Sequence, residues 1–307
     1  MLPYISPAQL LAAGHLGVSW STLPKVGSSD NEPYLLDICN QASDEANNIV
    51  RQQLGCSIVT EQIYGKSEFL NNTKAAGTLQ GVLSQGPIIR VIGGAWGFNA
   101  LPSALQTLNV NQFNITTPQF TPQLSNTSFA STAVRRFYLS QMPILTNANE
   151  VIVQITYLSG FPVATLTTES SSILNVTDVT GFNGFTPLYA NNSALSGSLA
   201  TIYDGRNTEI VQIVSTNSAT DVLGEPYGPG TLTLAADPQF THSVGTIISI
   251  FPPSIIEAVL FLAGALGLSR GATSLNVQGQ SRGTSNSISQ TFRKTASNLL
   301  APYTRWW

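Results

Sequence analysis

The sequence predicts an α+β protein with a helical bundle formed by N- and C-terminal helices, a large β-strand insertion between them, and an extended C-terminal arm. Two patterns lead to this fold class. Apolar residues recur with a period near 3.6 close to both ends of the chain, whereas the middle alternates apolar with polar residues or is rich in β-branched ones. Charged residues make up only 9% of the 307 residues, against about a quarter in an average soluble domain. A surface this neutral is suited to being covered by partners.

The first predicted part is a helical segment over residues 1–55. Its main helix spans residues 31–54, with Pro33 in the first turn and Gly55 as the C-terminal stop. Cys39 lies on the apolar face of this helix and Cys56 just beyond its end, so we expect both to be reduced core thiols. The apolar positions are Leu35, Ile38, Cys39, Ala42, Ala46, Ile49, Val50 and Leu54.

Two β modules are predicted in the middle of the chain. Residues 56–160 form a β-rich insertion that contains a long loop or arm at 96–132, where Gln, Asn, Thr and Pro are frequent and charges are few. Residues 161–252 form a second module, a small barrel or a sandwich. The expected strands are 57–63, 88–92, 107–110, 134–139, 151–158, 173–176, 209–214, 231–234 and 246–250.

The C-terminal part is predicted to complete the bundle with a core helix over residues 253–271. Ser254 and Glu257 match a capping box at its start. Its apolar stretch, residues 255–268, would reach about 21 Å as a helix, short of the ~30 Å core of a membrane. We therefore expect a buried helix and no membrane partner. A weaker helix is expected over residues 287–301, ended by Pro302.

Charge is distributed unevenly along the chain. All 16 acidic residues lie within residues 1–257, and the five basic residues that follow are Arg270, Arg282, Arg293, Lys294 and Arg305. We therefore predict that residues 272–307 form a basic arm that contacts an anionic partner, either nucleic acid or an acidic protein face. The alternatives are a merely soluble terminus, or a tail that folds back on its own core.

The sequence contains short patterns that are typical of enzymes, but the residues around each of them do not support an active site. Ser281 lies in a GQSRG motif, but no Asp, Glu or His follows it to complete a triad. Residues 65–67 (GKS) lack the earlier glycine of a phosphate-binding loop. His15 and His242 have no metal-ligand spacing, and we expect His242 to be a hydrogen-bonded structural residue. The sequence thus predicts a protein that is not an enzyme, with no cofactor, no metal and no sequence-specific DNA contact.

Several segments resemble the head-to-tail adaptor (connector, or head completion) proteins of tailed bacteriophages. The matching segments are 17–24 (GVSWSTLP), 151–162 (VIVQITYLSGFP), 174–182 (LNVTDVTGF), 202–205 (IYDG), 228–234 (GPGTLTL), 242–245 (HSVG), 268–273 (LSRGAT) and 299–305 (LLAPYTR). They are spread over most of the chain, except for residues 96–132, where the resemblance lapses.

The resemblance implies a structural virion protein of the neck, assembled in the host cytoplasm. Its copies would form a ring, a dodecamer in this family, that sits under the portal, lets DNA pass non-specifically through its lumen and meets a downstream neck or tail protein. The C-terminal arm would extend onto the portal, and terminal aromatic residues would suit an anchor in a partner's pocket. The expected portal-interface residues are Arg270, Arg282, Phe292, Arg293, Lys294, Leu299, Leu300, Tyr303, Arg305, Trp306 and Trp307.

Two other functions remain open at this point. The β module near residues 165–250 is similar to modules of other phage structural proteins, so a tail or baseplate protein is one alternative. A secreted β-rich surface adhesin is another, because the chain is rich in Asn and Thr, although its N-terminus lacks the features of a signal peptide.

Overall fold

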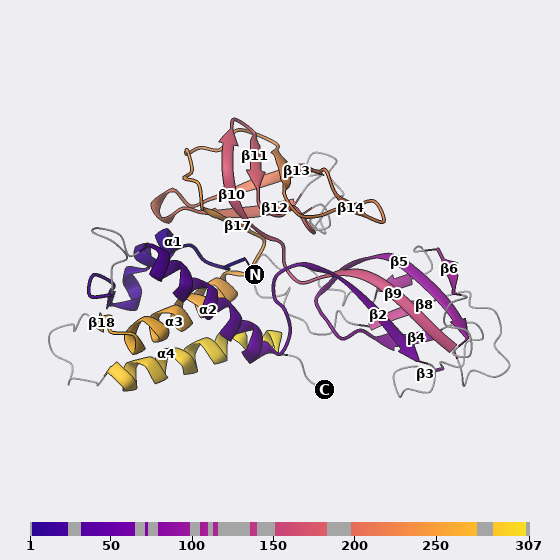
Figure 1. Ribbon diagram of the computed structural model, residues 1–307, viewed down its shortest axis with the longest axis horizontal. Coiled ribbons are helices and arrows are strands. Elements are labelled where there is room, and N and C mark those ends of the chain that lie inside the picture. The colour runs from indigo at the N-terminus through magenta and orange to yellow at the C-terminus, as the bar shows by residue number, and fades with distance from the viewer. Residues whose placement is uncertain are drawn as a thin grey trace.

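The structure, a computed structural model, shows a mixed α+β protein with a few helices and a β-rich part that includes a six-stranded barrel (Figure 1). This confirms the predicted α+β class and, for the second β module, the barrel rather than the sandwich. The described residues are 2–23, 32–64, 71–72, 79–98, 105–109, 113–115, 136–139, 151–182, 198–274 and 285–304.

The helices come from both ends of the chain and share one core. α3 contacts both α2 and α4, and eleven of its 17 residues are buried. A helix that is apolar all round must be covered on several sides, which is what α2, α4 and the N-terminal segment do. The helices are α1 (Pro7–Ala12), α2 (Glu32–Val50), α3 (Pro253–Ser269) and α4 (Ser285–Leu300), with 3-10 turns η1 (Gly14–Leu16) and η6 (Ala301–Tyr303).

Two predicted helix ends are wrong. α2 ends at Val50 rather than Leu54, because Arg51 adopts the left-handed conformation with φ of 57°. The capping box is also absent from α3, whose N-cap residue is Pro252. The hydroxyl of Ser254 instead contacts Tyr303, and Glu257 pairs with His15. Both side chains of the expected box thus serve tertiary contacts.

The first β module contains two antiparallel four-stranded sheets. One has the order β2-β9-β5-β6 and the other the order β3-β4-β8-β7. The expected loop over residues 96–132 is wrong where it is described, because β5 continues to Phe98 and two short strands follow. The strands are β2 (Ser57–Tyr64), β3 (Asn71–Asn72), β4 (Leu79–Val82), β5 (Ile88–Phe98), β6 (Gln106–Leu108), β7 (Phe113–Ile115), β8 (Arg136–Leu139) and β9 (Val151–Ser159).

The barrel closes in the order β10-β11-β16-β13-β12-β17, with all neighbours antiparallel. Its interior is aliphatic, and the outer side of β17 faces the helical core through Ile247. Its strands are β10 (Val163–Ser170), β11 (Ile173–Val176), β12 (Ser198–Tyr203), β13 (Glu209–Ser218), β16 (Gly230–Leu234) and β17 (Ile247–Ser249). A hairpin, β14 (Asp221–Val222) and β15 (Glu225–Pro226), extends from it, and the turn η5 (Gly205–Asn207) lies against α1.

The helices, the sheets and the barrel meet where residues 54–56 cross residues 160–162. The amide of Phe161 donates to the carbonyl of Leu54 at 2.7 Å, and the amide of Cys56 donates to the carbonyl of Phe161 at 2.8 Å. The ring of Phe161 then enters the helical core, where its centroid lies 5.8 Å from that of Phe251. The crossing is tight because Gly160, with φ of 97°, lies directly on the backbone of Gly55.

A second contact joins the barrel to the first β module. Arg90 of β5 forms an ion pair with Glu225 of β15, whose side chain is only 4% exposed. Next to this pair, Leu223 of the hairpin lies over Gly93, where a larger residue would collide with it. The barrel is therefore held to the first β module by an ion pair with a buried carboxylate, as well as by the covalent connection at residues 160–162.

Among the described helices, none is long and apolar enough to cross a membrane.

The crossing gives a direct test of the packing. A Cβ on Gly160 would lie 2.5 Å from the carbonyl oxygen of Gly55, whereas a Cβ on Gly245, with a similar φ of 93°, would meet nothing within 4 Å. We expect Gly245→Ala to cost about 1–2 kcal/mol of unfolding free energy from backbone strain alone. Gly160→Ala should cost at least about 2 kcal/mol more. Urea denaturation of the two variants measures this difference, and equal losses would contradict the role of the crossing.

Candidate functional site

The predicted partner-binding segment begins with a two-residue strand, β18 (Thr273–Ser274), which pairs with β1 (Val18–Ser19). Its main element is α4, whose apolar face lies against α3. The ring of Phe292 is 5.4 Å from that of Phe261, centroid to centroid, and a Cβ on Gly264 would lie 3.0 Å from it. Leu300 is fully buried, and Leu299 packs partly buried against the same core. The face that suggested docking onto a partner is therefore used inside the chain.

Tyr303 ties the end of α4 to the other helices. Its hydroxyl lies 2.8 Å from the hydroxyl of Ser254, and its carbonyl accepts a hydrogen bond of 2.9 Å from the side chain of Gln52. Burial raises the pKa of Tyr303, which therefore stays neutral. This residue links α3, η6 and the segment that follows α2 at one point.

Two of the predicted basic interface residues are paired within the chain. Arg270 donates to the carboxylate of Asp37 at 2.7 Å, and its guanidinium lies 5.4 Å from the ring centre of Tyr34. The hydrogen bond from Arg270 lowers the pKa of the Asp37 carboxyl. Arg293 pairs with Glu45 at 3.0 Å. Part of the C-terminal positive charge is thus neutralised by α2.

The expectation of an extended arm over residues 272–307 is therefore wrong for residues 285–303. Phe292, Leu299, Leu300 and Tyr303 are core residues rather than partner-facing ones. The alternative that the tail folds back on its own core applies to this stretch. Arg282, Arg305, Trp306 and Trp307 lie outside the described residues.

What α4 leaves on the surface is a polar strip, which we call the outer face of α4. Lys294 is exposed at its middle, beside the half-exposed Arg293. The members of the outer face of α4 are Gln290, Thr291, Arg293, Lys294, Ser297 and Asn298. Two of the predicted site residues lie on this face, Arg293 and Lys294, and both are basic.

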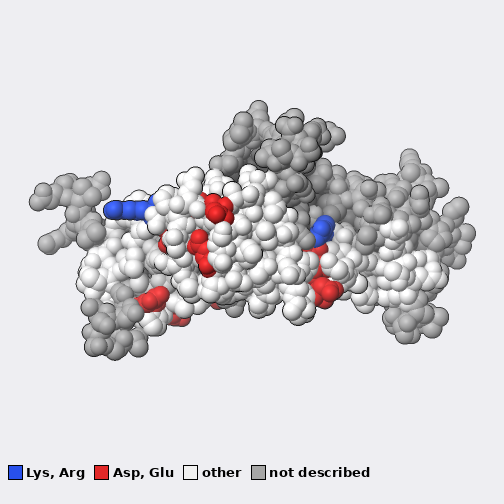
Figure 2. All heavy atoms as spheres, turned by 90° about the horizontal axis from the view of Figure 1, so that it is seen from above, with Lys and Arg blue, Asp and Glu red and all other residues white. Residues whose placement is uncertain are grey.

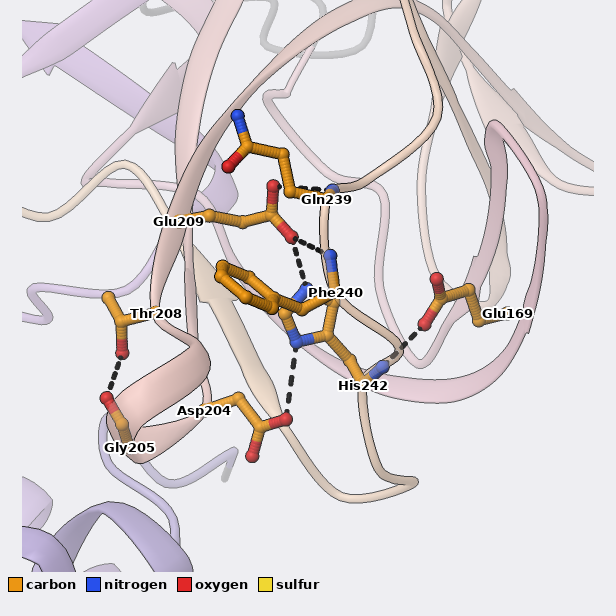
Figure 3. Close-up of polar contacts among 8 residues, drawn as sticks. All are labelled: Glu169, Asp204, Gly205, Thr208, Glu209, Gln239, Phe240 and His242. Carbon is orange, nitrogen blue, oxygen red and sulfur yellow. Dashed lines mark hydrogen bonds and ion pairs between the residues drawn. The ribbon is translucent and has the colours of Figure 1, made fainter.

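A second polar cluster surrounds His242, in the loop that leads to β17 (Figure 3). The side chain of His242 is fully buried, with Nδ1 3.2 Å from a carboxylate oxygen of Asp204 and Nε2 2.8 Å from one of Glu209. Its backbone amide donates to Glu169 at 2.8 Å. Only the doubly protonated imidazolium can donate to both carboxylates at once.

This cluster holds the barrel together rather than offering a reactive group. Each ring nitrogen of His242 faces a carboxylate, so neither is open to a substrate or a metal ion. Among the described residues, no group of three or more His, Cys, Asp or Glu side chains is arranged to hold a metal. The prediction of a hydrogen-bonded structural histidine is confirmed. Its partners could not be read from the sequence, because they lie 38 and 33 residues away.

Both cysteines are free, as predicted. Cys39 is buried on the inner side of α2, and burial raises the pKa of its thiol to about 12. Cys56 is partly buried at the crossing, and desolvation together with the nearby carboxylates of Asp178 and Glu225 raises the pKa of its thiol. Thiols with raised pKa values are poor nucleophiles at neutral pH.

Comparison with protein-family models, curated protein sequences and solved structures finds no match to this chain.

The packing of α4 predicts that its apolar residues stabilise the whole protein. We expect Leu300→Ala to reduce the free energy of unfolding by about 2–5 kcal/mol, because it leaves a cavity in the helical core. Lys294→Ala, on the outer face of the same helix, should leave it nearly unchanged. Thermal and urea unfolding of both variants checks this, and a stable, wild-type-like Leu300→Ala protein would show that α4 does not pack as described.

The Glu209 carboxylate predicts a pH-dependent contribution to stability. Burial alone would raise the pKa of Glu209, but hydrogen bonds from the amide of Gln239, the ring of His242 and the amide of Phe240 outweigh it and lower the pKa from its ordinary 4.5. A lowered folded-state pKa means that this stabilisation is present above about pH 4.5 and is lost as the pH falls through the lower value.

We therefore expect Glu209→Gln to cost about 1–3 kcal/mol at pH 7. The difference in unfolding free energy between the wild type and Glu209→Gln should become smaller as the pH falls below about 4.5. Asp44→Asn, on the exposed side of α2, is the control and should show neither effect. A gap for Glu209→Gln that stays constant from pH 7 to pH 3 would contradict the role of the ionised carboxylate.

Proposed function

We propose that this chain is a head-to-tail adaptor of a tailed bacteriophage, a structural virion protein. Its copies form a ring that sits under the portal, continues the DNA channel and joins the capsid vertex to the neck and tail. The observation that carries the proposal is the order of parts along the chain. α2 near one end and α3 and α4 near the other share one core, and both β modules are inserted between them.

In this proposal α2, α3 and α4 are the helical bundle of the adaptor. This is the arrangement expected from the resemblance of segments such as 17–24 and 299–305 to the adaptor family. The neutral surface supports the same reading, because a subunit covered by identical neighbours has little need of charge. In Figure 2, which looks onto the barrel side, charged side chains cover only a small part of the described surface.

The portal contact in this proposal uses the outer face of α4 and Arg305, the one basic residue that follows α4 in the sequence. Lys294 provides positive charge on that face, whereas Arg293 beside it is paired with Glu45, and an acidic face of the portal is the complementary surface. Phe292, the one aromatic residue of α4, has no part in it, since its ring packs against Phe261 of α3. DNA in the lumen would be contacted without sequence readout, through general electrostatics alone.

A second candidate is a different phage structural part, such as a tail or baseplate protein. The barrel favours it, because the module at residues 165–250 is similar to modules of such proteins. A tail component would bind other tail proteins rather than the portal. The two candidates therefore differ in which partner the purified protein binds.

The deciding experiment mixes the full chain with the assembled portal ring of the virus that encodes it. We expect the two to co-sediment, and negative-stain images to show a ring of added density at one end of the portal. A protein that stays monomeric and ignores the portal would overturn the adaptor proposal. Binding to purified tail assemblies instead would favour the second candidate.

Charge reversal on the outer face of α4 tests the portal contact. We expect Lys294→Glu to weaken portal binding about tenfold and to reduce its sensitivity to salt, because one complementary charge becomes repulsive. Arg206→Glu, an equal charge change at an exposed turn of the barrel, is the matched control and should bind as wild type does. Equal affinity of the two variants, measured by sedimentation at two salt concentrations, would exclude this face from the contact.

A further inference from the structure

We propose that the hairpin β14–β15 is a latch, which holds the first β module against the barrel and opens while both of them stay folded. In Figure 1 the hairpin extends from the barrel toward β5. The latch consists of two contacts with β5, the ion pair of Glu225 with Arg90 and the side chain of Leu223 over Gly93. This device is independent of the adaptor proposal.

The turn of the hairpin carries a residue that suits contact with β5 better than it suits the turn. Leu223 and Gly224 are the two central residues of this turn, with φ of 55° and 80°. A two-residue turn with both φ angles positive favours Asn or Gly at the first position, because other side chains are strained there. The side chain of Leu223 lies over Gly93, where a Cβ would collide with its Cδ1 atom. We therefore attribute the leucine at this position to its contact with β5.

β5 is irregular at the residues that meet the hairpin. Arg90 lies opposite Leu158 of β9 and Gly93 lies opposite Thr156, and the register shifts by one residue between Val91 and Gly93, as in a β-bulge. Residues three apart in a regular strand point to opposite faces, whereas Leu158 and Thr156 are two apart and share a face. The shift therefore places Arg90 and Gly93 on one face of the sheet, as β-bulges re-aim side chains in general. Both contacts of the latch are made on that face.

The charged contact of the latch is only half satisfied. Nη2 of Arg90 pairs with Oε2 of Glu225, whose side chain is 4% exposed. Within the described part of the chain, Oε1 of Glu225 and Nε of Arg90 are both buried and have no hydrogen-bond partner. The strongest pairs of this type use two parallel hydrogen bonds, one to each carboxylate oxygen. The cost of removing the carboxylate from water therefore offsets much of its attraction to Arg90.

The apolar contact of the latch is small. Leu223 is still 64% exposed although it lies over Gly93, so the contact removes only part of its surface from water. The stabilisation from apolar contact is proportional to the area that is buried. A partly buried leucine, a strained turn and a half-satisfied ion pair together give a contact that opens at a much smaller cost than unfolding of the barrel or the sheets.

The hairpin is firmly attached to the barrel at its base. The amide of Tyr227 donates to the carbonyl of Thr220 at 3.2 Å, and the hydroxyl of Thr220 donates to the carbonyl of Tyr227 at 2.6 Å. The amide of Val179 donates to the carbonyl of Gly228 at 2.9 Å. The hairpin therefore moves with the barrel, and the contact that opens is the one with β5.

The first β module stays attached at the crossing when the latch is open. The amide of Gly160 donates to the carbonyl of Pro87 at 2.9 Å, just before β5 begins. Ile89 lies close to Gly181 of the barrel, where a Cβ would be 3.2 Å from its Cδ1 atom. These contacts hold the end of β5 that is nearest to the crossing, and the residues of the latch lie farther along the strand. Opening therefore turns the sheets about the crossing, which acts as the hinge.

The test changes the latch without disturbing the turn. Leu223→Gly supplies a residue that the turn favours and removes the side chain that lies over β5. Ser171→Gly is the matched control, because Ser171 also has a positive φ, of 53°, in the turn between β10 and β11. Gly93→Val introduces a residue that strands favour into the space that Leu223 occupies. A fourth protein combines Leu223→Gly with Gly93→Val.

The distance between the sheets and the barrel is measured in the full chain by electron paramagnetic resonance between two spin labels. The labels are attached to Thr107→Cys of β6 and Asn217→Cys of β13, both at exposed positions. The native thiols of Cys39 and Cys56 have raised pKa values and react slowly with the label. We expect one main distance and a minor second distance in the wild type. The second population should rise at least about threefold in Leu223→Gly and in Gly93→Val, but not in Ser171→Gly.

The combined variant shows whether the two residues act through one contact. It should be no more open than Leu223→Gly alone, because Val at position 93 then has no side chain to collide with. An additive increase would contradict the contact of Leu223 with Gly93. A second population in Leu223→Gly that equals that of the wild type would overturn the latch. An increase that is fully explained by a loss of unfolding free energy in urea would also overturn it, because the whole protein would then be unfolding.

Discussion

The arrangement of the three parts depends on one close backbone contact, that of Gly160 on Gly55. Two of the three chain connections between the helices, the sheets and the barrel pass through this point, and two hydrogen bonds around Phe161 fix their direction. Phe161 then inserts into the helical core, so the crossing belongs to that core as well as to the β modules. The ion pair of Arg90 with Glu225 adds a second point of attachment. Two fixed points define an orientation that a single flexible connection would leave free.

The spacing of apolar residues predicted where the helices lie in the sequence, but not what covers the apolar face of each helix. The apolar stripe of α4 was visible in the sequence, but a stripe says only that a face is buried, not whether its own chain or another covers it. The signal that could have decided the matter lies in α3, where Leu262, Ala263 and Gly264 are buried in succession. A helix that is buried on all sides needs covering from several directions, and α2 alone cannot supply this.

Strands were predictable where apolar and polar residues alternate regularly, and β10 and β12 were missed. In β12 the outward positions include the apolar Leu199, and in β10 no apolar residue follows Leu166, so neither strand shows a complete alternation. The basic C-terminal region illustrates a different limit. Its charge excess is real in the sequence, yet Arg270 and Arg293 find their carboxylates more than 230 residues earlier, in α2. Pairings at such separation depend on the closed tertiary structure, which local patterns do not encode. The sequence therefore predicted that the candidate site is basic. It did not predict that the apolar residues expected to bind a partner are used inside the chain.

The insertion of both β modules between α2 and α3 also has a consequence for synthesis. About 200 residues separate the end of α2 from the start of α3. At roughly 5–20 residues per second, a ribosome needs about 10–40 s to deliver them. During that time the nascent chain displays the apolar side of α2, including Ile38 and Ala42, with its main partner still unmade. Newly made chains therefore pass through a period in which chaperone binding competes with aggregation, and this period ends only when α3 has been synthesised and can cover α2.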